Sequence, residues 1–156
     1  MTDHPSAQAV LHATAVAIHD RGILLLGQSG SGKSDLALRL IDNGARLIAD
    51  DAVRVTACDS PQPGRCQAAA LPGASGRLMV RDIGIIRLDP ALTATAPTLL
   101  SLAVSVDHVP PPLPGQFASL GQCLPLADRP LPLVHLRPFE ASAPRKVLLA
   151  LQRWGF

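Results

Sequence analysis

The sequence predicts a single α/β domain in which helices flank a mixed sheet. Three observations predict it: apolar, β-rich runs recur along the 156 residues, a glycine-rich loop joins one run to a helical segment, and a second helical segment ends the sequence. This length is typical of one domain, and 47% hydrophobic residues suffice for a core. We expect residues 1–156 to form one domain, with residues 1–9 flexible.

The first half of the sequence predicts four strands and a helix. Apolar side chains recur at helical spacing over residues 36–41, and Asn43-Gly44 predicts the end of that helix because glycine suits the left-handed conformation. The acidic pair Asp50-Asp51 separates the third predicted strand of this half from the fourth. The predicted strands are residues 10–18, 23–26, 46–49 and 52–57.

The second half predicts further strands, two irregular segments and a terminal helix. Residues 58–76 and 107–132 are rich in turn-forming residues and predict loops. Ser142 followed by Pro144 predicts a helix start with a serine cap. The apolar stripe of this helix comprises Val147, Leu148, Leu151 and Trp154, and the predicted strands are residues 78–88, 99–106 and 133–136.

Composition argues against several classes of protein. Fourteen Lys and Arg against 12 Asp and Glu give a net charge of +2, and the basic residues are scattered, so nucleic acid is not the expected partner. The three cysteines are too irregularly spaced for a disulfide framework or a zinc site, which favours free thiols in a reducing compartment. No apolar stretch approaches a membrane span. We expect a cytoplasmic protein.

Residues 27–34 carry the pattern Gly-x4-Gly-Lys-Ser between a predicted strand and a predicted helix, which is a phosphate-binding loop (P-loop) in its required context. Glycines let backbone N–H groups turn toward phosphate oxygens. Lys33 is placed to reach the β- and γ-phosphates, and Ser34 to bind Mg²⁺. The cofactors predicted are therefore ATP and Mg²⁺. The candidate binding residues are Gly27, Gln28, Ser29, Gly30, Ser31, Gly32, Lys33 and Ser34.

Asp50 and Asp51 follow a predicted strand, 17 and 18 residues after Lys33. Phosphoryl transfer needs a carboxylate to hold the metal, and often a second one to accept the proton of the attacking hydroxyl. The alternative is a turn with solvated charges, because Asp-Asp after a strand is also good turn chemistry. In a regular strand the two side chains point to opposite faces. Both can therefore serve one site only if the backbone kinks between them.

Taken together, these motifs resemble the catalytic domain of bacterial HPr kinase/phosphorylases. The matching elements are His12, the loop at 27–34, the segment 43–51 and the segment Arg81-Asp82-Ile83-Gly84-Ile85-Ile86. The resemblance is good over residues 10–90 and looser beyond, and it suggests a short form without the family's N-terminal domain. It implies the α/β P-loop kinase fold of the HPr kinase/phosphoenolpyruvate carboxykinase type.

What the resemblance implies is transfer of phosphate from ATP to a serine of HPr, a small phosphocarrier protein, with the reverse phosphorolysis in many members. Lys33 and His12 would assist, with Asp50 as the general base and Asp51, beside Ser34, as the metal ligand, although these two roles could be exchanged. Members of the family form hexamers, so the resemblance also suggests a homo-oligomer.

One departure from the family and two arginines near the end of the sequence keep other interpretations open. Met79 stands where family members commonly have a glutamate, which puts part of the acidic metal shell in doubt. Arg137 or Arg145 could stabilise the transferred phosphoryl group, or both could be solvated surface. The alternative functions are a small-molecule kinase using the same loop, and a nucleotide-binding regulatory module that transfers little phosphate.

Overall fold

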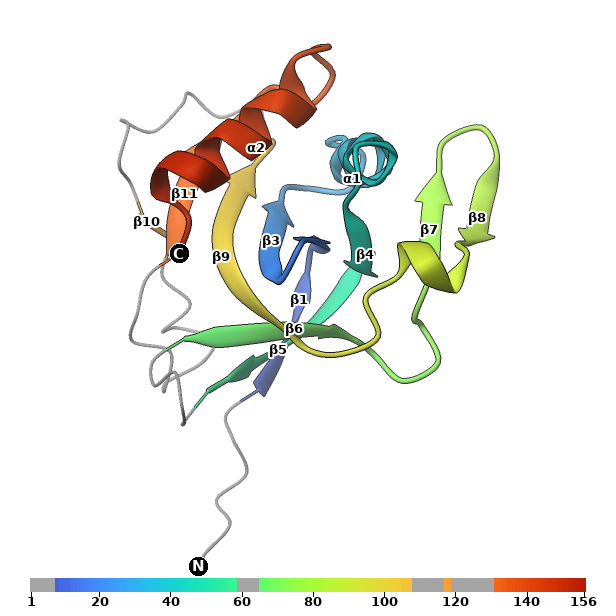
Figure 1. The fold of residues 1–156 in the computed structure, drawn as a ribbon. Helices are drawn as coiled ribbons and strands as arrows, with labels where there is room; N and C mark the ends of the chain where they lie inside the picture. Colours follow the sequence, from blue (N-terminus) through green and yellow to red (C-terminus); the bar gives the residue numbers. More distant parts are fainter. Residues whose placement is uncertain (1–7, 59–64, 108–116, 119–130) are drawn as a thin grey trace, which may run out of the picture.

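The computed structural model describes residues 8–58, 65–107, 117–118 and 131–156, and Figure 1 shows their arrangement. The helices are α1 (Lys33–Asp42), α2 (Ala143–Trp154) and the short 3₁₀ helix η1 (Pro90–Leu92). The strands are β1 (Gln8–His12), β2 (Thr14–Ile18), β3 (Arg21–Leu26), β4 (Arg46–Ala49), β5 (Ala52–Ala57), β6 (Cys66–Ala70), β7 (Arg77–Val80), β8 (Gly84–Arg87), β9 (Thr98–Ser105), β10 (Phe117–Ala118) and β11 (Leu131–His135).

The main sheet is mixed, as the sequence predicts. Its strand order is β1-β5-β6-β9-β3-β2-β4, with β11 also on β9 and β10 on β11. The start of β9 pairs antiparallel with β6, and the rest of β9 runs parallel to β3 and to β11. Parallel neighbours end at the same edge of a sheet, so the loop that follows β3 lies beside the residues that follow β9.

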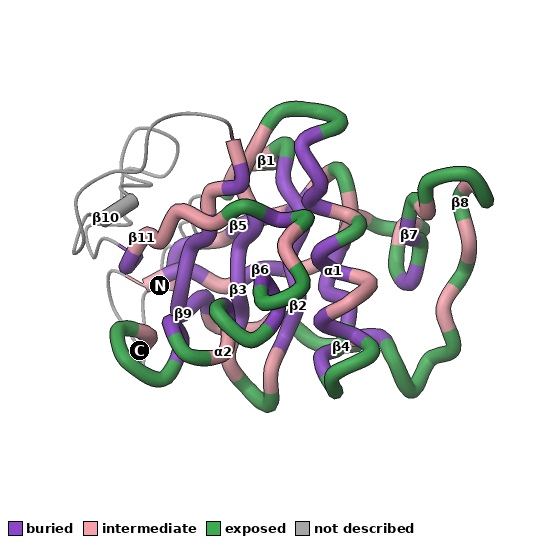
Figure 2. The backbone as a smooth tube through the Cα atoms, turned by 90° about the horizontal axis from the view of Figure 1, so that it is seen from above, coloured by how far each residue is buried: buried purple, intermediate pink, exposed green. Residues whose placement is uncertain are grey.

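The core lies on both faces of this sheet, which explains why β3 reads as an uninterrupted apolar run. Ile23 and Leu25 face the cluster that α1 and α2 cover, whereas Leu24 belongs to the cluster on the other face. All three side chains are fully buried. Both helices lie on one side of the sheet in Figure 1, and much of β3 and β9 is purple, that is buried, in Figure 2.

The β7–β8 hairpin forms a separate two-stranded sheet beyond α1 (Figures 1 and 2). Leu78 anchors it, because this side chain is fully buried in the cluster around α1. The tight turn has positive φ at Asp82 and Gly84. The strand predicted at 78–88 is therefore two strands whose halves pair with each other, Met79 opposite Ile85.

The predicted elements on the P-loop side are confirmed. The strand, loop and helix follow one another as predicted, and Gly44 ends α1 with a φ of 101°. The strand predicted at 10–18 is instead two strands that meet at Ala13. This division matters because β1 pairs with β5 whereas β2 pairs with β3 and β4.

Three further predictions differ from the structure. Residues 66–70, predicted as part of a loop, form β6, because the short run Cys-Gln-Ala-Ala-Ala pairs on both sides with β5 and β9. Ser142 makes no side-chain capping bond at α2. Trp154 is 41% exposed rather than part of the core stripe, which Val147, Ala150 and Leu151 supply.

Several predictions concern residues that the structure does not describe. Residues 1–7, 59–64, 108–116 and 119–130, with Cys123 among them, lie outside the described residues, so the predicted flexibility of residues 1–7 and most of the predicted loop at 107–132 stay predictions. Residues 8–9, also predicted to be flexible, instead belong to β1 and pair with β5. Within the segment predicted as a loop at 107–132, residues 117–118 form β10 and residues 131–132 begin β11. Cys66 is a buried free thiol, as predicted. In the described part of the chain, neither helix is long and apolar enough to cross a membrane.

Candidate active site

The glycine loop leaves β3 and enters α1 with the geometry of a phosphate cradle. Gly30 and Gly32 have φ values of 80° and 105°, in the left-handed region where glycine is favoured. A Cβ atom on Gly32 would also lie 2.9 Å from the side chains of Pro138 and Phe139. Both backbone conformation and space therefore require glycine at this position.

The first turn of α1 presents unused hydrogen-bond donors. Gly32 is the N-cap and carries no capping side chain, and no side chain among the described residues caps the N–H groups at the helix start. Such N–H groups, together with the positive end of the helix dipole, bind phosphate oxygens. The loop therefore fits the triphosphate of a nucleotide.

Lys33 is turned back onto its own loop. Its Nζ donates to the carbonyl oxygen of Gly27 and, at 3.1 Å, to that of Gln28, and the residue is only 6% exposed. Burial lowers the pKa of the Lys33 ammonium, while the carboxylates of Asp107, Asp50 and Asp51 act in the opposite direction. A bound phosphate would add further negative charge and favour the ammonium form.

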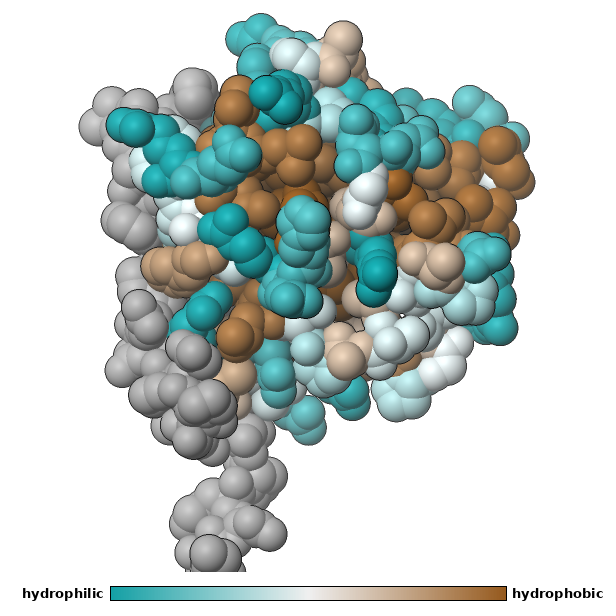
Figure 3. All heavy atoms as spheres, in the orientation of Figure 1, coloured by the Kyte–Doolittle hydropathy of each residue, from teal (hydrophilic) through white to brown (hydrophobic). Residues whose placement is uncertain are grey.

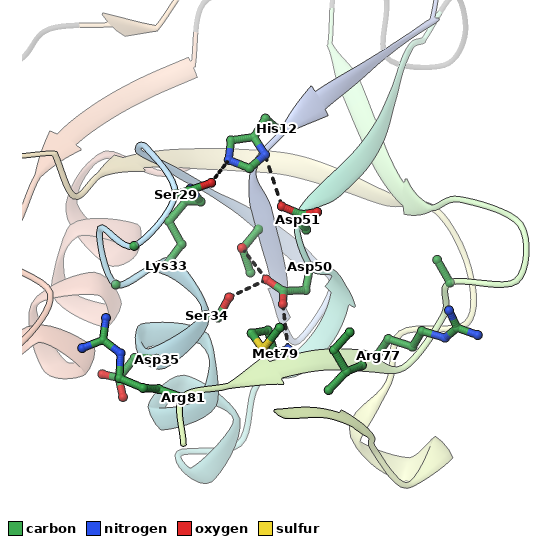
Figure 4. Close-up of a pocket in the computed structure, with 15 residues that line it drawn as sticks. His12, Ser29, Lys33, Ser34, Asp35, Asp50, Asp51, Arg77, Met79 and Arg81 are labelled. Atoms are coloured by element: carbon green, nitrogen blue, oxygen red, sulfur yellow. Dashed lines mark hydrogen bonds and ion pairs between the residues drawn. The ribbon is translucent and has the colours of Figure 1, made fainter. Parts of the chain in front are cut away.

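Asp50 is held by three donors (Figure 4). Its Oδ1 accepts from the hydroxyls of Thr14 at 2.7 Å and Ser34 at 2.8 Å, and its Oδ2 accepts from the backbone N–H of Met79 at 2.9 Å. Thr14 is fully buried. The carboxylate is thereby fixed against the hydroxyl of the P-loop serine.

Asp51 lies at a kink that brings it to the same site. Its φ of 68° is unusual for a residue other than glycine, and it interrupts the alternation that would point neighbouring side chains to opposite faces. One oxygen of Asp51 lies 3.2 Å from Nδ1 of His12, and Nε2 of His12 lies 3.2 Å from Oγ of Ser29. The Asp51 and His12 side chains are 81% and 51% exposed, so this pair faces solvent and any incoming reactant.

These groups surround a cavity of about 640 Å³. The P-loop, His12, Thr14 and the acidic pair form one wall. The hairpin forms the opposite wall, and its lining residues there are Arg77, Met79, Arg81 and Ile85. The structure thus brings together His12, Ser29, Gly30, Gly32, Lys33, Ser34, Asp50 and Asp51 from the predicted set.

The remaining P-loop candidates support the loop from outside the cavity lining. Gly27 and Gln28 supply the carbonyl oxygens that hold Lys33. Ser31 is buried, and its Oγ has no hydrogen-bond partner among the described residues. A Cβ on Gly27 would lie 2.5 Å from that Oγ, which explains the glycine.

The two tail arginines do not line the cavity. Arg137 is 85% exposed and lies 3.8 Å from Glu140, and Arg145 is exposed near the start of α2. Glu140 also pairs with Lys146 at 2.9 Å, and its pKa is lowered chiefly by that contact. Of the two interpretations, the geometry favours solvated surface.

Sequence reasoning missed Arg77 on the hairpin wall and two polar residues on the P-loop side, Thr14 and Asp107. Thr14 is a polar residue within an otherwise apolar strand, and this pattern could have indicated a buried hydrogen bond. Asp107 accepts from the backbone N–H of Gln28 at 2.9 Å. It follows β9, parallel to β3, and carboxyl ends of parallel strands are where ligand sites form.

The donor set fits Mg²⁺ bound mainly through phosphates. In the described ranges there is no cluster of three or more His, Cys, Asp or Glu side chains that could enclose a metal ion. Mg²⁺ does not need one, since it keeps several waters and takes one or two protein ligands beside substrate phosphates. The adjacent oxygens of Ser34 and Asp50 are ligands of that kind.

Comparison with known proteins agrees with this geometry. Over 92 residues the chain is 41% identical to the HPr kinase/phosphorylase of Clostridium acetobutylicum, covering 59% of this chain and 29% of that protein. It is 43% identical over 76 residues to the HPr kinase/phosphorylase of Clostridium tetani, covering 49% and 24%. The chain thus matches under a third of the length of these relatives.

The fold comparison extends over nearly the whole chain. The structure of the Hpr(Ser) kinase/phosphatase from Coxiella burnetii superposes with a TM-score of 0.69 at 20% identity, covering 92% of this chain and 94% of that one. This confirms the predicted fold. Residues 4–97 match the family described as HPr Serine kinase C-terminal domain. They include the loop, the acidic pair and the hairpin, and the chain therefore belongs to that family.

Proposed function

We propose that this chain is an ATP- and Mg²⁺-dependent kinase that phosphorylates a serine of an HPr-type phosphocarrier protein. The observation that carries the proposal is the contact between Ser34 and Asp50, 2.8 Å apart at the end of a glycine loop, with the Asp51–His12 pair in the same cavity. The names of the family and of its relatives suggest the acceptor.

Binding of the triphosphate uses groups already in place. The N–H groups at the start of α1 hold phosphate oxygens, and Lys33 exchanges the carbonyl oxygens of Gly27 and Gln28 for phosphate. Ser34 and Asp50 hold Mg²⁺, which when bound neutralises charge on the phosphates. Since Thr14 and the N–H of Met79 also bind Asp50, this carboxylate keeps its direction throughout.

Proton removal from the acceptor falls to Asp51. Unlike Asp50, it is largely exposed and its backbone kink presents it to the cavity. His12 orients it through Nδ1 and accepts or donates through Nε2, where Ser29 now lies. The geometry therefore supports the exchange of the roles first assigned by resemblance: Asp50 is the metal-side carboxylate, and Asp51 is the general base.

Other properties follow from the same proposal. Inorganic phosphate bound in the cradle beside a phosphoserine would allow the reverse phosphorolysis. We place the reaction in the cytoplasm, and a homo-oligomer such as a hexamer stays a prediction from resemblance.

The test is a transfer assay. We expect γ-labelled ATP, Mg²⁺ and an HPr-type protein from the same genome to give label on a serine of the acceptor, located by mass spectrometry. Lys33→Ala should abolish it, whereas Lys146→Ala, which changes the other lysine of the chain, should not. Label on a small metabolite instead would assign a small-molecule kinase.

A second candidate function is favoured by Met79. Its side chain lines the cavity at a position where the family resemblance predicts a carboxylate, so the site has one acidic side chain fewer than that resemblance implies. Nucleotide binding without transfer to any acceptor would identify a regulatory module.

A further inference from the structure

The β7–β8 hairpin has two faces of opposite character. Alternation sends Leu78, Val80 and Ile86 toward the core around α1. The other face is exposed, and we call it the hairpin face. It consists of Arg77, Met79, Arg81, Ile85 and Arg87.

The composition of the hairpin face is unfavourable for the isolated fold. Met79 and Ile85 lie directly opposite each other and are 49% and 68% exposed. Arg77 and Arg87 are also directly opposite, and like charges in that position destabilise a sheet. Among the described residues none of the three arginines pairs with a carboxylate, although Arg81 lies 5.8 Å from the ring centre of Phe139. Folding alone does not account for this pattern.

The hairpin face continues into the active site. Four of its five residues line the cavity opposite the P-loop, and Arg87 extends it beyond the cavity. In Figure 3 hydrophobic residues reach the surface on the side where the hairpin lies. A molecule that covers this face therefore also reaches Asp51 and Ser34.

The surface fits a protein better than a nucleotide base. Small-molecule sites enclose most of their ligand, whereas this face is open. Exposed Met and Arg around an apolar centre are typical of protein interfaces. The three guanidinium groups have no carboxylate partner among the described residues, so they are complementary to a partner that carries carboxylates.

We propose that the hairpin face is the docking surface for the acceptor protein, and that the docked segment carries carboxylates around an apolar patch beside the phosphorylated serine. This inference rests on the proposed function, because it places the acceptor of that reaction.

The test uses Arg87→Glu, since Arg87 lies outside the cavity. With an HPr-type protein from the same genome as probe, we expect its Kd, measured by calorimetry, and its KM to rise about tenfold, the size expected for a close interfacial charge pair. The kcat and the Kd for Mg·ADP should stay within about twofold, because the P-loop is untouched. Arg46→Glu is the matched control, because Arg46 is exposed at the end of β4 that lies away from Asp50. Arg87→Lys keeps the positive charge and should retain most of the affinity for the acceptor protein.

Three results would overturn the proposal: unchanged acceptor binding in Arg87→Glu, a change in Mg·ADP affinity of the same size, or loss of self-association in place of acceptor binding. The two proposals fail separately. Arg87-dependent acceptor binding without transfer would refute the kinase and retain the docking surface, whereas transfer with Arg87-independent binding would refute the docking surface and retain the kinase.

Discussion

The two walls of the cavity are built in different ways. The P-loop wall stands on strands of the main sheet, and its polar groups are tied to one another: Asp50 alone accepts three hydrogen bonds. The hairpin wall is a separate two-stranded sheet, buried on one face and exposed on the other. The first wall therefore fixes the positions that chemistry requires, while the second can change its exposed residues without disturbing the core.

The largest expected effect distinguishes the roles of the two carboxylates of the P-loop wall, Asp50 and Asp51. Asp51→Asn removes the proposed base and should lower kcat by about 10²- to 10⁴-fold, with Mg·ADP affinity little changed. Asp50→Asn should instead weaken the Mg²⁺ dependence of nucleotide binding. Steady-state kinetics and calorimetry at varied Mg²⁺ check this, and the opposite pattern would restore the original assignment of the roles.

Thr14→Val tests whether Asp50 needs its buried donor. Removing the hydroxyl costs one charge-assisted hydrogen bond, about 1.5–3 kcal/mol, and frees Asp50 to turn away from Ser34. We expect kcat/KM to fall about tenfold or more. Thr14→Ser keeps the hydroxyl and is the control, so equal losses in both variants would contradict a role for the hydrogen bond.

The attachment of the hairpin wall to the rest of the protein depends on Leu78. Its fully buried side chain holds the hairpin to α1, so Leu78→Ala should destabilise the protein by about 2–5 kcal/mol. Denaturant unfolding measures this, with Ile85→Ala as the exposed control on the other face of the hairpin. Comparable losses in both variants would mean that the hairpin is not anchored by one face.

Met79→Glu tests whether the hairpin wall can also contribute to metal binding, because it places a carboxylate there. Because Met79 already donates its N–H to Asp50, the new side chain would lie close to the metal ligands. We expect the Mg²⁺ concentration for half-maximal nucleotide binding to drop several-fold. Met79→Gln is the isosteric neutral control, and an equal drop there would exclude a charge effect.

The smallest effect concerns the protonation of Lys33. Burial lowers the pKa of the Lys33 ammonium in the folded, nucleotide-free protein. At pH values between this lowered pKa and the ordinary one, the unfolded chain binds more protons than the folded protein. The free energy of unfolding therefore rises with pH in this window. Nucleotide should raise the pKa. Only two lysines contribute to ¹³C-lysine NMR spectra, and Lys146→Arg assigns them. Asp107→Asn should lower the pKa of Lys33 further, and a raised value would contradict this account.

Local patterns sufficed for much of the site. The spacing from Gly27 to Ser34 specified the cradle because its chemistry is local: glycine conformations, a helix start and two side chains in adjacent positions. Residues 66–70 show the limit. Their alanine-rich segment has weak intrinsic strand preference, and its place in the sheet comes from pairing with β5 and β9, which are distant in sequence.

The sequence by itself determined the phosphate-binding loop, the acidic pair after a strand, and the family resemblance. Tertiary structure decided the environments of the two carboxylates, on which the proposed division of their roles rests: Asp51 lies at a backbone kink, and Asp50 accepts from the buried Thr14. Tertiary structure also placed the β7–β8 hairpin, with its exposed apolar and basic face, on the opposite side of the cavity from the P-loop. Side-chain environments arise from contacts between distant segments, and no local pattern encodes them.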